Sequence, residues 1–128
     1  MATNFWKYLV CAAALFAFVV PNSIAGSCDN ILNEDIIKKC LADDLSAADK
    51  ELNRVYIRLR ESIGNTEGEL LKQTEITWIN LRNSDCEFEA QSVSGGTAYQ
   101  LVYLSCLISQ TKIRTKQLSD WTKLFKKR

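Results

Sequence analysis

The fold is decided by residues 78–114, which read WINLRNSDCEFEAQSVSGGTAYQLVYLSCLISQTKIR. In this stretch Gly95-Gly96-Thr97 separates two segments of helical character, and Cys86 and Cys106 stand ten residues before and ten residues after Gly96. An α-helix rises about 1.5 Å per residue, so positions equidistant from the turn of an antiparallel pair face each other. A disulfide between Cys86 and Cys106 would close this hairpin.

The first 25 residues have the three-part pattern of a secretory signal: a basic start, an apolar run over 8–20, and Ser23-Ile24-Ala25 as a cleavage site. A transmembrane anchor is the alternative, but this run is shorter than the roughly 20 apolar residues that cross a bilayer. We expect cleavage after Ala25, no membrane span in the mature protein, and a periplasmic or secreted location. Lipid anchoring at Cys28 is less favoured, because Ala25-Gly26-Ser27 lacks the large aliphatic residue usual three positions upstream.

Residues 26–128 are long enough for one domain with one core. Cleavage removes Cys11 and leaves four cysteines, an even number that predicts two disulfides in an oxidising compartment. Four cysteines allow three pairings. We favour Cys28 with Cys40, which would pin the N-terminus to a nearby helix, together with Cys86 and Cys106.

Capping residues set the expected helix boundaries. A short helix over 33–44 starts at Asn33. The first long helix starts at a capping box of Ser46 and Asp49 and ends at Gly64-Asn65, where a left-handed residue is expected. The next two long helices start at Thr66 with Glu69 and at Thr97 with Gln100. The fold class is therefore all-α, a disulfide-stapled antiparallel helical bundle of three long helices plus a short N-terminal helix.

Apolar residues spaced by three and four predict the buried faces of the three long helices. Trp78 is expected to bury the most area. The expected faces are Leu45, Ala48, Leu52, Val55, Tyr56, Leu59 and Ile63 in the first; Leu70, Leu71, Thr74, Trp78, Leu81 and Phe88, flanked by Ile79 and Cys86, in the second; and Leu101, Leu104, Ile108, Leu118 and Phe125, flanked by Cys106 and Ile113, in the third.

The composition argues against an enzyme and against a cofactor or metal. The chain has no histidine, which removes the usual general base and the commonest metal ligand. Its cysteines are too far apart for zinc or thioredoxin-type sites. Neighbouring carboxylates such as Glu87 and Glu89 point in different directions on a helix. A mature chain with equal numbers of acidic and basic residues also argues against nucleic-acid binding.

The charges are unevenly distributed along the chain. Residues 26–96 hold 14 acidic and 8 basic side chains, whereas residues 97–128 hold 1 acidic and 7 basic. This division has two interpretations: it holds neighbouring helices together, or it makes an acidic face for a basic partner.

One ordered set of residues extends through nearly all of the mature chain: Leu52-Asn53, Tyr56, Trp78, Arg82, Cys86, Gly95-Gly96-Thr97, Cys106, Arg114 and Leu118. With this set the chain resembles the LprI-type lysozyme-inhibitor family of small secreted bacterial domains. The family commonly has glutamine where this chain has Glu75, and aspartate where it has Asn83. We therefore expect Arg82 to pair with Asp85 or with a carboxylate on a neighbouring helix.

The resemblance implies a non-enzymatic exported protein that binds and inhibits a lysozyme. Trp78 and Tyr56 are expected to fill the core, and Arg82 and Asn53 to satisfy polar groups between helices. Because lysozymes are usually strongly basic, candidate contacts come from the acidic half of the chain. A structural or immunity-type envelope protein that binds another secreted protein or toxin is the alternative function. The candidate contacts are Glu67, Glu69, Glu87 and Glu89.

Overall fold

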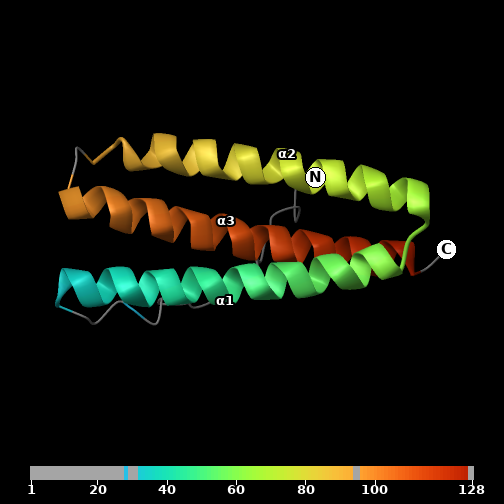
Figure 1. The fold of residues 1–128 in the computed structure, drawn as a ribbon, viewed down its shortest axis with the longest axis horizontal. Coiled ribbons are helices and arrows are strands. Elements are labelled where there is room, and N and C mark those ends of the chain that lie inside the picture. Colours follow the sequence, from blue (N-terminus) through green and yellow to red (C-terminus); the bar gives the residue numbers. More distant parts are fainter. Residues whose placement is uncertain (1–27, 29–31, 94–95, 127–128) are drawn as a thin grey trace, which may run out of the picture.

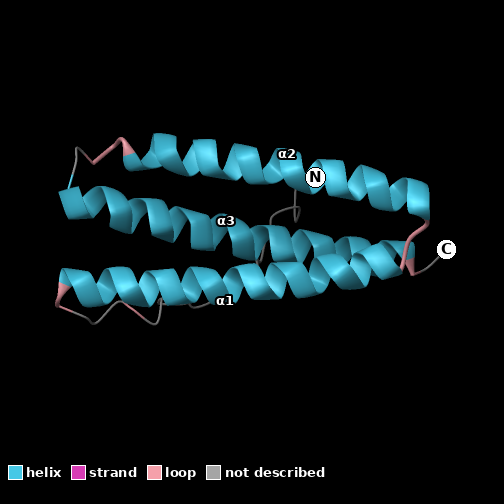
Figure 2. Cartoon of the chain, viewed as in Figure 1, coloured by secondary structure: helices cyan, strands magenta, loops and turns pink. Residues whose placement is uncertain are grey.

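The described part of the chain folds into three long antiparallel helices (Figure 1). This computed structural model describes residue 28 and residues 32–93 and 96–126. The helices are α1 (Glu34–Glu61), α2 (Asn65–Ala90) and α3 (Gly96–Phe125), joined by short connections (Figure 2). The all-helical, disulfide-linked bundle expected from the sequence is confirmed, whereas the proposed signal segment lies outside the described residues.

The expected short N-terminal helix is not a separate element. Asn33 caps α1 as predicted, since its Oδ1 accepts hydrogen bonds from the backbone N–H groups of Asp35 (3.0 Å) and Ile36 (3.2 Å). The helix then continues through Ser46 to Glu61 without interruption. No glycine or proline lies between 34 and 61, so nothing in the backbone stops the helix at Leu45.

Unlike the cap at Asn33, the other predicted helix caps were wrong. Helix α2 begins at Asn65 after Gly64, with no side-chain cap, and Gly64 has a φ of −71° instead of a left-handed conformation. The left-handed residue is Gly96, with a φ of 72°, at the start of α3. Thr66 and Thr97 consequently lie inside their helices. Serine and threonine motifs recur by chance in helical sequences, and here the glycines decide where the chain turns.

The helix α3 is the central element of the bundle, because α1 and α2 each pack on it and make little contact with each other (Figure 1). The main core cluster joins all three helices through Leu52, Val55, Leu59, Leu71 and Leu118. A second cluster forms around the disulfide between Cys86 and Cys106, with Leu107. The contact between α3 and α1 is more extensive than that between α3 and α2.

The expected buried face of α2 was largely wrong. Leu70, Ile79, Leu81 and Phe88 are exposed, and Trp78 is only partly buried. Ile113 of α3 is exposed as well. Because α2 packs mainly against one helix, it buries a narrow strip, and small or polar side chains occupy that strip. The buried positions are Gly68, Leu71, Glu75, Cys86 and Ala90.

Both expected disulfides are present. Cys28 is bonded to Cys40, and Cys86 to Cys106, with Cα atoms 5.9 and 5.5 Å apart. The first fastens Cys28 to α1, and the second fastens the end of α2 to α3. A bonded Cys28 sulfur has no free thiol for a thioether-linked lipid, so this disulfide and lipid anchoring at Cys28 exclude each other.

We expect the two disulfides to differ in their contribution to stability. Replacing either cysteine pair by alanines should lower the free energy of unfolding by about 3 kcal/mol through loop entropy alone. Loss of the Cys86–Cys106 bond should cost more, because it also leaves a cavity in the second cluster and weakens the narrow α2–α3 contact. Urea denaturation followed by circular dichroism measures both effects. A larger loss from the Cys28–Cys40 pair would contradict this ranking.

Candidate functional site

A polar network lies where α2 crosses its neighbours, and Arg82 is one of its two centres. Its Nη1 donates to Asp49 Oδ1 of α1 (3.3 Å) and to Thr111 Oγ1 of α3 (2.8 Å). Its Nε donates to Asn83 Oδ1 (3.2 Å). The expected partner on a neighbouring helix is therefore Asp49, which the sequence had suggested as a helix cap.

The second centre is Arg114, whose side chain is 6% exposed. Its Nε donates to Glu75 Oε1 (3.0 Å), Nη2 donates to the same oxygen, and Nη1 donates to Gln117. Its guanidinium also stacks between two indole rings, 5.4 Å from the centroid of Trp78 and 4.9 Å from that of Trp121. The Arg82 guanidinium lies 5.1 Å from the centroid of the same Trp78 ring, so cations and indoles alternate.

This network is structural. Every buried side-chain nitrogen or oxygen among the described residues has a hydrogen-bond partner. The arginines are held by carboxylates and rings inside the molecule and do not point into an open cleft. Other residues of the family set, Leu52, Tyr56 and Leu118, belong to or pack on the core. Asn53 is exposed, so it does not lie between helices as expected, and Gly95 lies outside the described residues.

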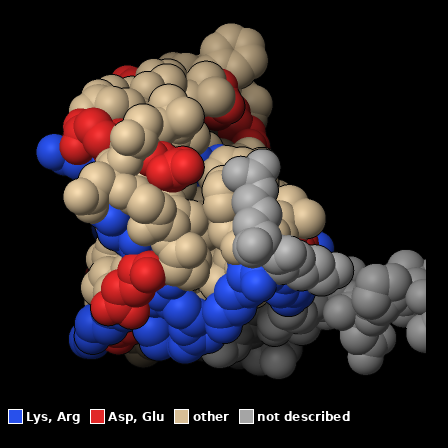
Figure 3. Space-filling model, turned by 90° about the vertical axis from the view of Figure 1, so that its right-hand side faces the viewer, with Lys and Arg blue, Asp and Glu red and all other residues tan. Residues whose placement is uncertain are grey.

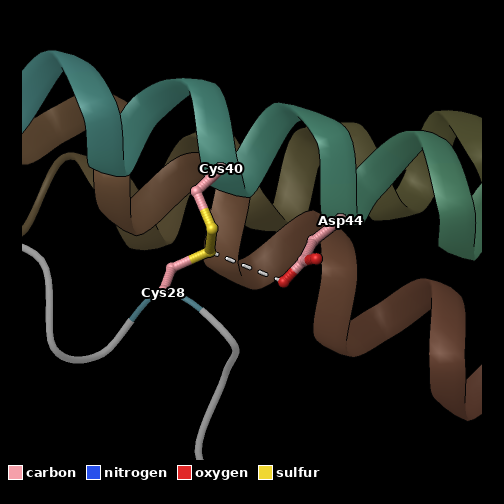
Figure 4. A group of neighbouring side chains, drawn as sticks. All are labelled: Cys28, Cys40 and Asp44. Atoms are coloured by element: carbon pink, nitrogen blue, oxygen red, sulfur yellow. Dashed lines mark hydrogen bonds between the residues drawn. A yellow bond between two sulfur atoms is a disulfide. The ribbon is translucent and has the colours of Figure 1, made fainter.

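Among the residues that the structure describes, one carboxylate and sulfur cluster resembles a metal site, and it is formed by Cys28, Cys40 and Asp44 (Figure 4). The Sγ of Cys28 lies 3.6 Å from Asp44 Oδ2. Both sulfurs are already joined in the disulfide, and metal binding by cysteine requires a thiolate. This arrangement therefore holds Cys28 against α1 and gives no reason to assign a metal.

The antiparallel arrangement converts the uneven charge of the chain into a difference between the two ends of the bundle. The half around the α1–α2 turn, residues 48–78 and 111–126, holds ten basic and seven acidic side chains. The opposite half, residues 32–47 and the described part of 79–110, holds three basic and seven acidic side chains. The first half is net +3 and the second is net −4.

The acidic end also carries an exposed aromatic side chain, the most exposed one among the residues that the structure describes. Phe88, near the end of α2, is 82% exposed and lies between Glu87 and Glu89, with Asp85 one turn earlier. All three carboxylates are exposed. On the helix Asp85 shares the side of Phe88, whereas Glu87 and Glu89 project to either side of it. A large apolar side chain in water beside charges of one sign is a candidate contact for another protein.

The four glutamates suggested by the sequence do not form one patch. Glu87 and Glu89 belong to this acidic end, whereas Glu67 and Glu69 lie in the first turns of α2. A separation of 18 residues along a helix corresponds to about 27 Å. Sequence reasoning missed Phe88 as an exposed residue. Its seven-residue spacing from Leu81 is typical of a buried helix face, so the sequence predicts it in the core.

The comparisons with known proteins identify the family. A model of the family described as lysozyme inhibitor LprI matches residues 28–118. The chain belongs to the LprI family. It is 29% identical over 106 residues to an uncharacterized Escherichia coli K12 protein called YecT, with 70% of this chain and 65% of that protein covered. It is 26% identical over 106 residues to an uncharacterized Rhizobium meliloti protein called R02472, with 73% and 76% covered.

No solved structure shows a significant match to this LprI domain. The chain spans less than two thirds of the length of YecT, so this relative carries sequence outside the shared domain. The matched residues 28–118 contain both disulfides and the Arg82 and Arg114 network. The family match therefore covers the disulfides and the arginine network that hold the three helices together, which we call the frame of the bundle.

We expect Arg114 to be the most sensitive polar residue of this frame. Arg114→Met should lower the free energy of unfolding by about 3–5 kcal/mol, because it leaves the Glu75 carboxylate buried without its cation. The double variant Glu75→Met with Arg114→Met should recover much of that loss, since no charge remains buried. Thermal and urea denaturation of the single and double variants give the comparison.

Lys116→Met is the matched control, because it breaks the exposed pair of Lys116 with Asp120 (3.0 Å) on the same helix. Its effect should stay within about 0.5 kcal/mol. Equal stability of the Arg114→Met and Lys116→Met variants would show that the buried network does not hold α2 to α3.

Proposed function

We propose that this protein is an exported, non-enzymatic inhibitor of a lysozyme, and that the acidic end of the bundle contacts the enzyme. Its membership of the LprI family supports the class of function. The two disulfides are consistent with residues 26–128 working in an oxidising compartment after removal of the signal. The observation that carries the site is Phe88, 82% exposed and flanked by Glu87 and Glu89.

The charges and the ring act at different stages of binding. The net −4 half of the bundle attracts a basic protein over a distance comparable to the Debye length, which raises the association rate at low salt. On contact, the Phe88 ring is removed from water and supplies a buried anchor, while the exposed carboxylates of Asp85, Glu87 and Glu89 meet basic groups of the partner. Lysozyme bound in this way would lose access to its polymeric substrate.

Of the four glutamates suggested by the sequence, the proposal retains Glu87 and Glu89. Glu67 and Glu69 lie on the half with a net charge of +3, which repels a basic partner. The alternative, an immunity-type protein that binds another basic secreted protein, would use the same acidic end. The two functions are distinguished by the response of lysozyme itself.

An inhibition assay with the purified mature domain tests the proposal. We expect lysozyme turnover to fall in the presence of micromolar protein at low salt. Phe88→Ala should weaken inhibition by roughly tenfold, because removing an anchor side chain costs over 1 kcal/mol. Glu87→Gln with Glu89→Gln should slow association and flatten the salt dependence.

Glu69→Gln is the matched control, since it removes one exposed glutamate from the same helix at the opposite end. It should leave inhibition unchanged. Full lysozyme turnover at all protein concentrations would remove the proposed function, and equal effects of Glu69→Gln and Glu87→Gln would remove the assignment to the acidic end.

A further inference from the structure

The basic end of the bundle contains an apolar groove that the proposed function does not use. The groove has a volume of about 340 Å³, within the range of ligand-binding pockets. All three helices contribute to it, at the end where α1 turns into α2 and α3 finishes. Its lining residues are Leu59, Ile63, Glu67, Leu70, Leu71, Thr74, Trp121, Leu124 and Phe125.

The apolar side chains at the rim of this groove are open to solvent. Leu70 of α2 is 68% exposed and Leu124 of α3 is 62% exposed, whereas Leu59 at the base is 1% exposed. Trp121 and Phe125 are partly buried beside them. A partner that covered Leu70 and Leu124 would remove apolar surface from water, which favours binding.

Cationic side chains lie at the same end of the bundle as this groove. Figure 3 views the molecule from this end and shows Lys and Arg gathered along its lower part, where α1 lies, with uncharged surface and several Asp and Glu patches above them. Arg58, Arg60, Lys123 and Lys126 belong to the last turns of α1 and α3 or directly follow them. Arg60 lies against α2 at Gly68, where an added Cβ would come within 2.2 Å of its Cζ atom.

Acidic side chains at the same end of the bundle offset part of this positive charge. Glu67 lines the groove, Glu61 and Glu69 lie at the same end, and Asp120 pairs with Lys123 (2.9 Å) and Lys116 (3.0 Å). The Lys123 and Lys116 ammonium groups hold the pKa of Asp120 below its usual range, so its carboxylate stays ionised. With all of these counted, this half of the bundle is still net +3.

We propose that this end of the bundle docks on an anionic phospholipid surface, with one acyl chain entering the groove. None of the three helices described by the structure could span a bilayer, so the contact would be peripheral. Indole and leucine side chains favour the boundary between headgroups and acyl chains, and lysine and arginine stems extend their charges to lipid phosphates. The electrostatic attraction of these basic residues to the anionic surface weakens as salt is added.

This mode of docking orients the molecule. The basic end faces the lipid, and Phe88 of the acidic end lies 18 residues along α2 from Leu70 at the groove rim, hence about 27 Å away. A protein partner and a membrane could therefore be bound at the same time. The inference depends on the groove and its charges, and it does not require that the partner be lysozyme.

Vesicle binding by the purified mature domain tests this proposal. We expect cosedimentation with vesicles that contain phosphatidylglycerol, weak binding to vesicles of phosphatidylcholine alone, and a decrease at high salt. Brominated acyl chains should quench the fluorescence of Trp121. Leu124→Glu and Leu70→Glu should each reduce partitioning by roughly tenfold or more, because they place a charge at the acyl-chain boundary, whereas Glu67→Gln should strengthen it.

Phe88→Glu is the matched control, since it places the same charge on an exposed apolar residue at the opposite end. It should leave vesicle binding intact and abolish lysozyme inhibition, while Leu124→Glu should do the reverse. The proposal is overturned if phosphatidylglycerol has no effect, or if vesicles bind without quenching of Trp121. It is equally overturned if the groove binds only free fatty acid, or a second copy of the chain detected as a dimer that Leu124→Glu dissociates.

Discussion

The position of α2 depends on the guanidinium of Arg114, held between two indole rings and bonded to Glu75. Helix α2 has little contact with α1, and the strip that it buries against α3 is narrow. Leu71 is its single member of the main core cluster. The remaining attachment comes from Arg114, from Arg82 and from the disulfide between Cys86 and Cys106. Such contacts are directional, so they fix orientation more sharply than apolar packing does.

Because α2 is attached along a narrow strip only, most of its surface is exposed to solvent. A helix covered on two sides would bury Leu70, Leu81 and Phe88, as its periodicity predicted. Here these side chains are in water at both ends of the bundle. One end combines them with acidic residues and the other with basic residues, because antiparallel packing sets the C-terminal turns of α1 and α3 beside the start of α2. The two ends consequently suit partners of opposite charge.

Much of the frame could be predicted from the sequence because it depends on local rules. The symmetric placement of Cys86 and Cys106 about Gly96 predicted the hairpin, and Asn33 predicted the start of α1. The family pattern also identified Arg82 and Arg114 as special positions. Glu75 was noted only as a departure from the glutamine common in the family. The structure gives it a role, since its carboxylate neutralises a cation that is otherwise buried.

The sequence by itself determined the all-helical class, the antiparallel hairpin and the uneven charge, and it favoured the two observed disulfides among three possible pairings, since each follows from spacing along one chain. Only the tertiary structure decided which apolar residues are buried. Periodicity shows that Leu81 and Phe88 share a side of α2, but burial depends on whether another helix covers that side. Tertiary packing likewise placed Glu87 and Glu67 at opposite ends and joined Asp49 to Arg82 across 33 residues. Those pairings depend on how the helices cross, which no local pattern encodes.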